Sequence, residues 1–87
     1  MSITVELTYD MSVQLGMRRF EVEAAPTVAD AVKLARDRFR DSGADFEQLT
    51  RIAAVAVNGV LVNHRKGMKT RLADGDVLAF VKSAAGG

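Results

Sequence analysis

Hydrophobic and polar residues alternate in two segments near the start of the chain. In ITVELTY the apolar residues that share one face are Ile3, Val5, Leu7 and Tyr9. In RRFEVEA, Phe20 and Val22 take the inward phase. Alternation with a period of two and β-branched residues is typical of a half-buried strand. We interpret the intervening DMSVQLG as a loop, so the pattern predicts an antiparallel pair of strands.

After Pro26 the pattern becomes helical. In TVADAVKLARDRFR the apolar positions with helical spacing are Val28, Ala31, Val32, Ala35 and Phe39. Thr27 is a suitable N-cap, and Asp30 three residues later completes an approximate capping box. The pattern predicts one amphipathic helix in a region that ends at Gly43. An irregular connection or short helical turn follows over residues 44–50, with Phe46 and Leu49 in contact with the core.

Three further strands are predicted in the second half. IAAVAVN is apolar on both faces, which favours a central position in a sheet. Asn58-Gly59 predicts a two-residue hairpin turn before the short return strand VLV. The polar NHRKGMKTRL is interpreted as a loop, Asp74-Gly75-Asp76 as a turn and VLAFVK as the last strand.

The predicted order, ββαβββ, defines the fold class. One main helix packed on one face of a mixed sheet of four to five strands gives an α+β domain with the β-grasp architecture of ubiquitin-like proteins. We expect residues 1–82 to form this single domain and residues 83–87 a flexible C-terminal tail. The residues expected in its core include Phe20, Val32, Phe39 and Phe80.

The amino-acid composition excludes several classes of function. The 12 basic and 11 acidic residues nearly balance, which argues against a nucleic-acid partner. The chain contains no membrane-length apolar run and no signal-peptide pattern at its N-terminus, so we expect a cytoplasmic protein without a membrane partner. Zero cysteines and one histidine, His64, exclude disulfides, thiol catalysis and a multi-histidine metal site. Neither a Ser–His–Asp set nor a phosphate-binding glycine loop is present, so we expect no enzyme.

Small residues follow the last strand in SAAGG, Ser83 to Gly87. A segment of Gly and Ala has almost no side-chain width and can thread a narrow channel. A Gly-Gly pair is by itself a weak signal and is more often only a solvated end or a remnant of cloning. Its functional interpretation therefore depends on the rest of the chain.

The whole chain resembles the MoaD/ThiS family of ubiquitin-like sulfur carriers. The matching segments are PTVADAV at Pro26 to Val32, AVNG at Ala56 to Gly59, LADGD at Leu72 to Asp76, the apolar strand through Phe80, and AGG at Ala85 to Gly87. The resemblance implies that a ubiquitin-activating-type adenylyltransferase activates the carboxylate of Gly87. A sulfurtransferase or cysteine desulfurase then supplies sulfur, and an acceptor enzyme uses the resulting thiocarboxylate.

The resemblance also assigns roles to individual residues. Gly86 and Ala85 would thread the tail into the partner, and Leu61, Val81 and Lys82 would dock it. ATP and Mg²⁺ would belong to the activating partner, and this chain would bind no cofactor or metal. Leu61, Val77 and Val81 suit core packing as well as an exposed docking patch on the helix-free face of the sheet.

Several alternatives stay open. Lys82-Ser83 stands where the small subunit of molybdopterin synthase usually has prolines, so the pathway could be molybdopterin, thiazole, cysteine or secondary-metabolite synthesis. The chain could instead be a ubiquitin-like modifier joined to lysines through Gly87, or a β-grasp interaction module without chemistry. His64 suits an ordinary exposed loop residue, and the Arg65–Lys69 loop a solvated surface or a site for phosphate or an acidic partner.

Overall fold

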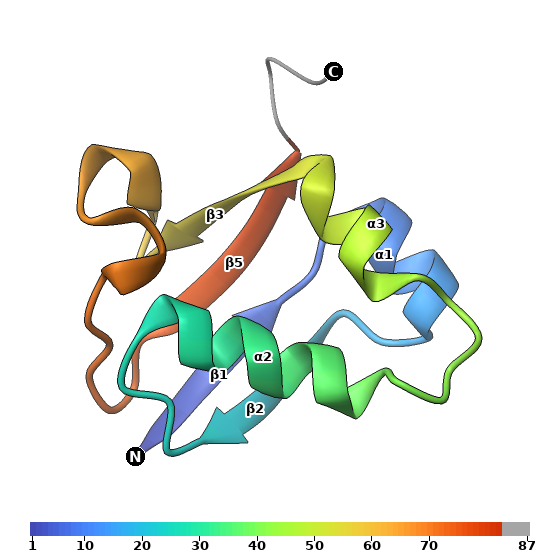
Figure 1. Ribbon diagram of the computed structural model, residues 1–87, viewed down its shortest axis with the longest axis horizontal. Coiled ribbons are helices and arrows are strands. Elements are labelled where there is room, and N and C mark those ends of the chain that lie inside the picture. Colours follow the sequence, from blue (N-terminus) through green and yellow to red (C-terminus); the bar gives the residue numbers. More distant parts are fainter. Residues whose placement is uncertain (83–87) are drawn as a thin grey trace.

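The computed structural model describes residues 1–82 (Figure 1). One five-stranded sheet has the order β2-β1-β5-β3-β4. Its strands are β1 (Ser2–Glu6), β2 (Arg19–Glu23), β3 (Ala53–Val57), β4 (Val60–Leu61) and β5 (Val77–Lys82). β1 pairs antiparallel with β2 and parallel with β5, and β3 pairs antiparallel with both β5 and β4. The mixed sheet and its main helix confirm the predicted α+β, β-grasp fold.

The main helix, α2 (Val28–Arg38), crosses one face of the sheet (Figure 1). The Thr27 hydroxyl oxygen accepts a hydrogen bond from the Asp30 amide at 3.3 Å, and the same hydroxyl donates to the Asp30 carboxylate at 2.7 Å. The predicted cap therefore forms. Val28, Ala31 and Ala35 turn inward and are buried, as the helical spacing predicts.

Three of the four predicted core residues, Phe20, Phe39 and Phe80, are buried. Phe39 packs edge-on against Phe20 and stacks on Phe46, which in turn packs edge-on against Phe80. These four rings link α2 to β2 on one side and to β5 on the other. Val32 departs from the prediction, because it is only half-buried and packs against the rim of the core.

The segment predicted as a loop, DMSVQLG, forms a helix instead, α1 (Tyr9–Leu15). The Thr8 hydroxyl accepts a hydrogen bond from the Met11 amide at 3.1 Å and caps the helix, and Gly16 closes it with φ of 80°. Met11 is buried in the core, whereas Tyr9, predicted to face inward, is 72 % exposed. The alternation of the first strand therefore stops at Leu7, because the cap at Thr8 redirects the chain.

The remaining connections are short. α3 (Phe46–Arg51) forms in the segment predicted as a turn of helix, and Phe46 and Leu49 are buried as expected. Asn58 and Gly59 both adopt positive φ, 50° and 84°, which is the conformation of the predicted hairpin turn. The return strand ends at Leu61 rather than Val62. The polar loop after it contains two short 3-10 turns, η1 (Val62–His64) and η2 (Gly67–Lys69). None of the helices within residues 1–82 has the length and hydropathy that crossing a membrane requires.

Candidate functional site

The face of the sheet opposite α2 carries a strip of small apolar side chains. Residues directly opposite each other on paired strands project on the same side. Val81 lies opposite Ala54, Ala79 opposite Ala56, and Ala56 also opposite Leu61. With Val77, which shares the phase of Ala79 and Val81, these residues form the apolar strip: Ala54, Ala56, Leu61, Val77, Ala79 and Val81. All except Ala56 are half-buried, which leaves them accessible to a partner.

The other half of this face is polar. β1 and β2 present Ser2, Thr4, Glu6, Arg19, Glu21 and Glu23 on it. Arg19 forms an ion pair with Glu6, and the Ser2 hydroxyl donates a hydrogen bond to Glu21. Because burial of polar and charged groups costs free energy, the apolar strip over β5, β3 and β4 is the part of the face that a partner can desolvate at low cost.

The structure places the predicted docking residues on different sides. Leu61 and Val81 both belong to the apolar strip. Lys82 is exposed and takes the opposite phase of β5, since its neighbour across the sheet is Ala53, which packs against the core. Ala85, Gly86 and Gly87 lie outside the described residues. The sequence analysis did not single out the alanines of the strip, although the alternation in AAVAV places Ala54 and Ala56 on one face.

Two of the sequence motifs, AVNG and LADGD, are joined by hydrogen bonds at the start of β5, and we call this arrangement the clasp. The Asn58 side-chain amide donates to the Asp76 carboxylate at 3.0 Å, and its carbonyl oxygen accepts from the Val77 amide at 2.9 Å. The Ala73 amide donates to the other Asp76 oxygen at 2.8 Å. The Ala73 and Asn58 hydrogen bonds, with a smaller contribution from the Arg65 charge, hold the pKa of Asp76 below its ordinary value. AVNG and DGD thus fix the β3–β4 turn against β5.

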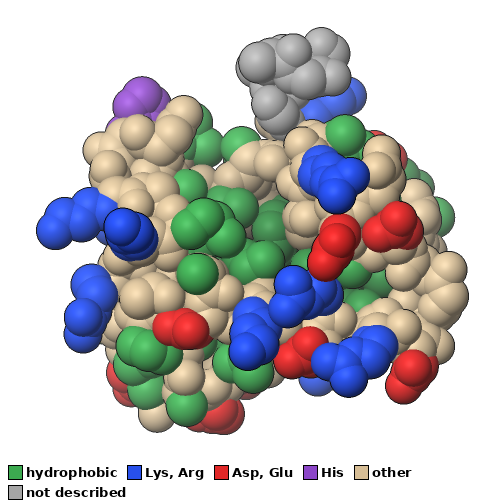
Figure 2. Space-filling model, viewed as in Figure 1, with side chains coloured by type: hydrophobic (Ala, Val, Ile, Leu, Met, Phe, Trp, Pro, Cys, Tyr) green, Lys and Arg blue, Asp and Glu red, His purple; other side chains and the backbone are tan. Residues whose placement is uncertain are grey.

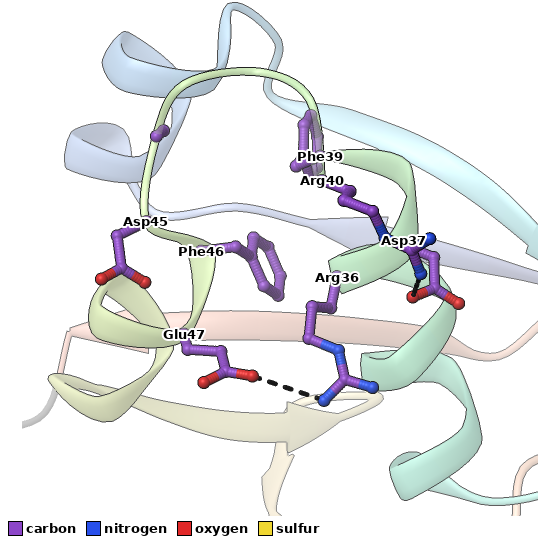
Figure 3. Close-up of a pocket in the computed structure, with 8 residues that line it drawn as sticks. Arg36, Asp37, Phe39, Arg40, Asp45, Phe46 and Glu47 are labelled. Atoms are coloured by element: carbon purple, nitrogen blue, oxygen red, sulfur yellow. Dashed lines mark hydrogen bonds and ion pairs between the residues drawn. The ribbon is translucent and has the colours of Figure 1, made fainter.

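A shallow pocket lies between the end of α2 and α3 (Figure 3). Phe39 and Phe46 contribute to its lining, with ring centroids 5.7 Å apart. Arg36 and Glu47 form an ion pair across it at 3.5 Å, and Arg40 pairs with Asp37 at 2.8 Å. The pocket lining contains no serine, threonine, cysteine, lysine or histidine side chain. Within residues 1–82, no group of three acidic, histidine or cysteine side chains could hold a metal ion.

The chain matches the model of the ThiS family over residues 13–87. It therefore belongs to the ThiS family, whose members are ubiquitin-like sulfur carriers. Small carriers of this type are generally not catalysts themselves. A comparison with curated protein sequences gives no significant match.

Solved structures show the same fold. Small archaeal modifier protein 1 from Methanosarcina acetivorans superimposes with a TM-score of 0.76 at 19 % identity, covering 99 % of this chain and 96 % of its own. CysO, in the BexX/CysO complex of Amycolatopsis orientalis, gives 0.72 at 25 % identity, with coverage of 98 % and 99 %. A chain of the complex of molybdopterin-converting factor subunits 1 and 2 from Helicobacter pylori gives 0.62 at 20 %, with full coverage of both chains.

Proposed function

We propose that this carrier transports sulfur as a thiocarboxylate on the carboxyl group of Gly87. The observation that carries the proposal is the apolar strip, because half of it lies on β5, the strand that leads into residues 83–87. An extended chain covers about 3.4 Å per residue, so an active site that takes Gly87 must lie within about 17 Å of Lys82. A partner that binds the strip through Leu61 and Val81 is therefore held where it can receive the tail.

The chemistry follows from the reactivity of a carboxylate, which is a poor electrophile. In the activating enzyme, a carboxylate oxygen of Gly87 attacks the α-phosphorus of ATP and pyrophosphate leaves, which gives an acyl adenylate. A sulfur nucleophile then attacks the acyl carbon and AMP leaves. When the donor is a persulfide, a thiol must afterwards cleave the S–S bond to release the thiocarboxylate. ATP and Mg²⁺ act on the partner, and this chain supplies the acyl group and the docking surface.

The acceptor is an enzyme that incorporates sulfur into a small-molecule product. CysO is solved in complex with BexX, and a molybdopterin-converting factor is solved as a complex of its two subunits. Each is an assembly of two proteins. We propose that this chain docks in the same general way, with the apolar strip against the acceptor and Gly87 in its active site.

The test is a reaction with the activating enzyme, ATP and a sulfur donor, followed by intact-mass and fragment mass spectrometry. The expected product is heavier by the difference between sulfur and oxygen, with the change localised to Gly87. One residue added after Gly87 should abolish the reaction, because the terminal carboxyl group would no longer lie at the reacting position in the active site of the activating enzyme. Gly86→Val should slow it severely, because a β-branched side chain widens the tail and restricts its backbone. Sulfur found on the added residue would contradict the argument from position.

A second function, protein modification, is favoured by the similarity to small archaeal modifier protein 1. The activation would be the same, but a lysine amine of a target protein would attack the acyl carbon in place of sulfur. Isopeptide-linked adducts at Gly87 in cells, without any gain of sulfur by the purified chain, would replace the carrier function with this one.

A further inference from the structure

The helix side of the sheet is only partly covered. A helix is about 10 Å across, whereas four strand spacings of about 4.8 Å make a five-stranded sheet about 19 Å wide. Arg38, the last residue of α2, lies over the Phe20 ring of β2 at 4.9 Å, so the C-terminal end of α2 reaches the β2 edge. On the β3 side of α2, η1 and α3 contact β3, and η2 contacts α2. Figure 2 shows hydrophobic side chains in a hollow between η1 and η2 on one side and α3 on the other.

Apolar residues from five elements meet in this region, which we name the β3–β4 shoulder. Val60 lies opposite the buried Val57, so it projects on the helix side, and it is 43 % exposed. Val55 lies opposite the buried Phe80 and projects on the same side. The full set is Val32 of α2, Val55 and Val60 of the sheet, Val62 of η1 and Met68 of η2. Met68 is 45 % exposed, and Val32, Val55 and Val62 are half-buried.

The charges around the shoulder are nearly all positive. Between Gln48 and Ala73 every charged residue is a cation: Arg51, Arg65, Lys66, Lys69 and Arg71. Lys33 follows Val32 on α2. Glu47 is the acidic residue of α3, and it forms an ion pair with Arg36. Lys33, Lys66 and Lys69 are exposed and take part in no ion pair within residues 1–82.

We infer that the β3–β4 shoulder is a second docking surface and that its occupant is an acidic peptide segment with apolar anchor residues, supplied by a partner protein. The apolar floor would take the anchors, and Lys33, Lys66 and Lys69 would pair with flanking carboxylates. A nucleic acid would use the cations and leave the apolar floor without a role. The shoulder lies on the face opposite the apolar strip, so both surfaces can be occupied at once. The inference does not depend on the sulfur chemistry.

The experiment selects peptides from a random 12-residue library displayed on phage, with the full chain as bait. The selected peptide is then titrated into the ¹⁵N-labelled chain. The expected consensus combines Asp or Glu with aliphatic residues, and the shifted amides should lie in residues 29–36 and 55–71. Affinity should fall as salt is raised, because the cations are exposed. Thiocarboxylate formation measured in parallel separates this inference from the proposed function.

Matched variants test the two components of the surface. Lys66→Glu and Lys69→Glu should each raise the dissociation constant about fivefold, whereas Arg18→Glu, the same charge change beside β2 at the other edge of the sheet, should leave it unchanged. Val60→Ser should weaken binding without changing the fold, which the NMR spectrum reports directly. Failure to enrich any peptide, a consensus without acidic residues, or shifts confined to the apolar strip would overturn the inference. Self-association of the chain through Val60 and Met68 would overturn it too, with a second copy as the occupant.

Discussion

The two sides of β5 differ in what they contribute. On the helix side, Leu78 and Phe80 are buried in the core. On the opposite side, Ala79 and Val81 are half-buried and lie against alanines of β3, which leaves a flat surface. One strand thus contributes large side chains to stability and, in the function that we propose, small ones to partner recognition. Substitutions on one phase of β5 should therefore alter stability, and substitutions on the other phase should alter partner binding.

The largest expected effect is on the core side. Phe80→Ala or Phe39→Ala should lower the free energy of unfolding by about 3–5 kcal/mol, because each removes an aromatic ring from the linked aromatic cluster. That is a large part of the stability of a small domain. Denaturant melts give the measurement, with Val81→Ala on the other phase as control, expected to cost about 1 kcal/mol. A loss below about 1 kcal/mol for Phe80→Ala would show that the ring is not part of the stabilising core.

Substitutions in the apolar strip, on the opposite side of the sheet, should weaken partner binding and leave stability nearly unchanged. Leu61→Ser or Val81→Ser should weaken the complex with the activating enzyme about tenfold, because each removes an apolar contact from the strip. The free energy of unfolding should change by about 1 kcal/mol or less. Isothermal titration calorimetry gives the affinity. Glu21→Gln on the polar half of the same face is the matched control and should bind normally. Equal losses for all three variants would mean that the face is not divided in its function.

The smallest expected effect concerns the clasp that starts β5. The pKa of Asp76 is below its ordinary value of 3.8, so ionised Asp76 stabilises the fold at pH above that value. This contribution is lost as the pH falls through the lowered pKa. Asp76→Asn should therefore destabilise the chain by about 0.5–1 kcal/mol at neutral pH, and the difference from wild type should shrink below about pH 4. Unfolding measured across this range gives the test, and a difference independent of pH would contradict the role of the charge.

Much of the fold could be predicted from local signals. The alternation in ITVEL and RRFEV, the Thr27 cap and Asn58-Gly59 each act within a few residues, so their structures follow from the sequence. α1 could not be predicted in the same way. Thr8 continues a strand pattern and is also a good N-cap, and burial of Met11 against the core favours the helix. A choice between two compatible local structures depends on the rest of the core.

The candidate site also has features that the sequence predicts and features that only the structure reveals. The sequence by itself determined the family, through motifs spread over the chain, and it is the basis of our proposal that Gly87 carries the sulfur. Only the tertiary structure decided that Leu61 shares a face with Val81, that Lys82 has the opposite phase, and that Val60 and Met68 border an uncovered part of the sheet. The physical reason is that strand register and the coverage of a sheet by its helix arise from contacts between residues distant in the sequence, which the local periodicity of the chain does not contain.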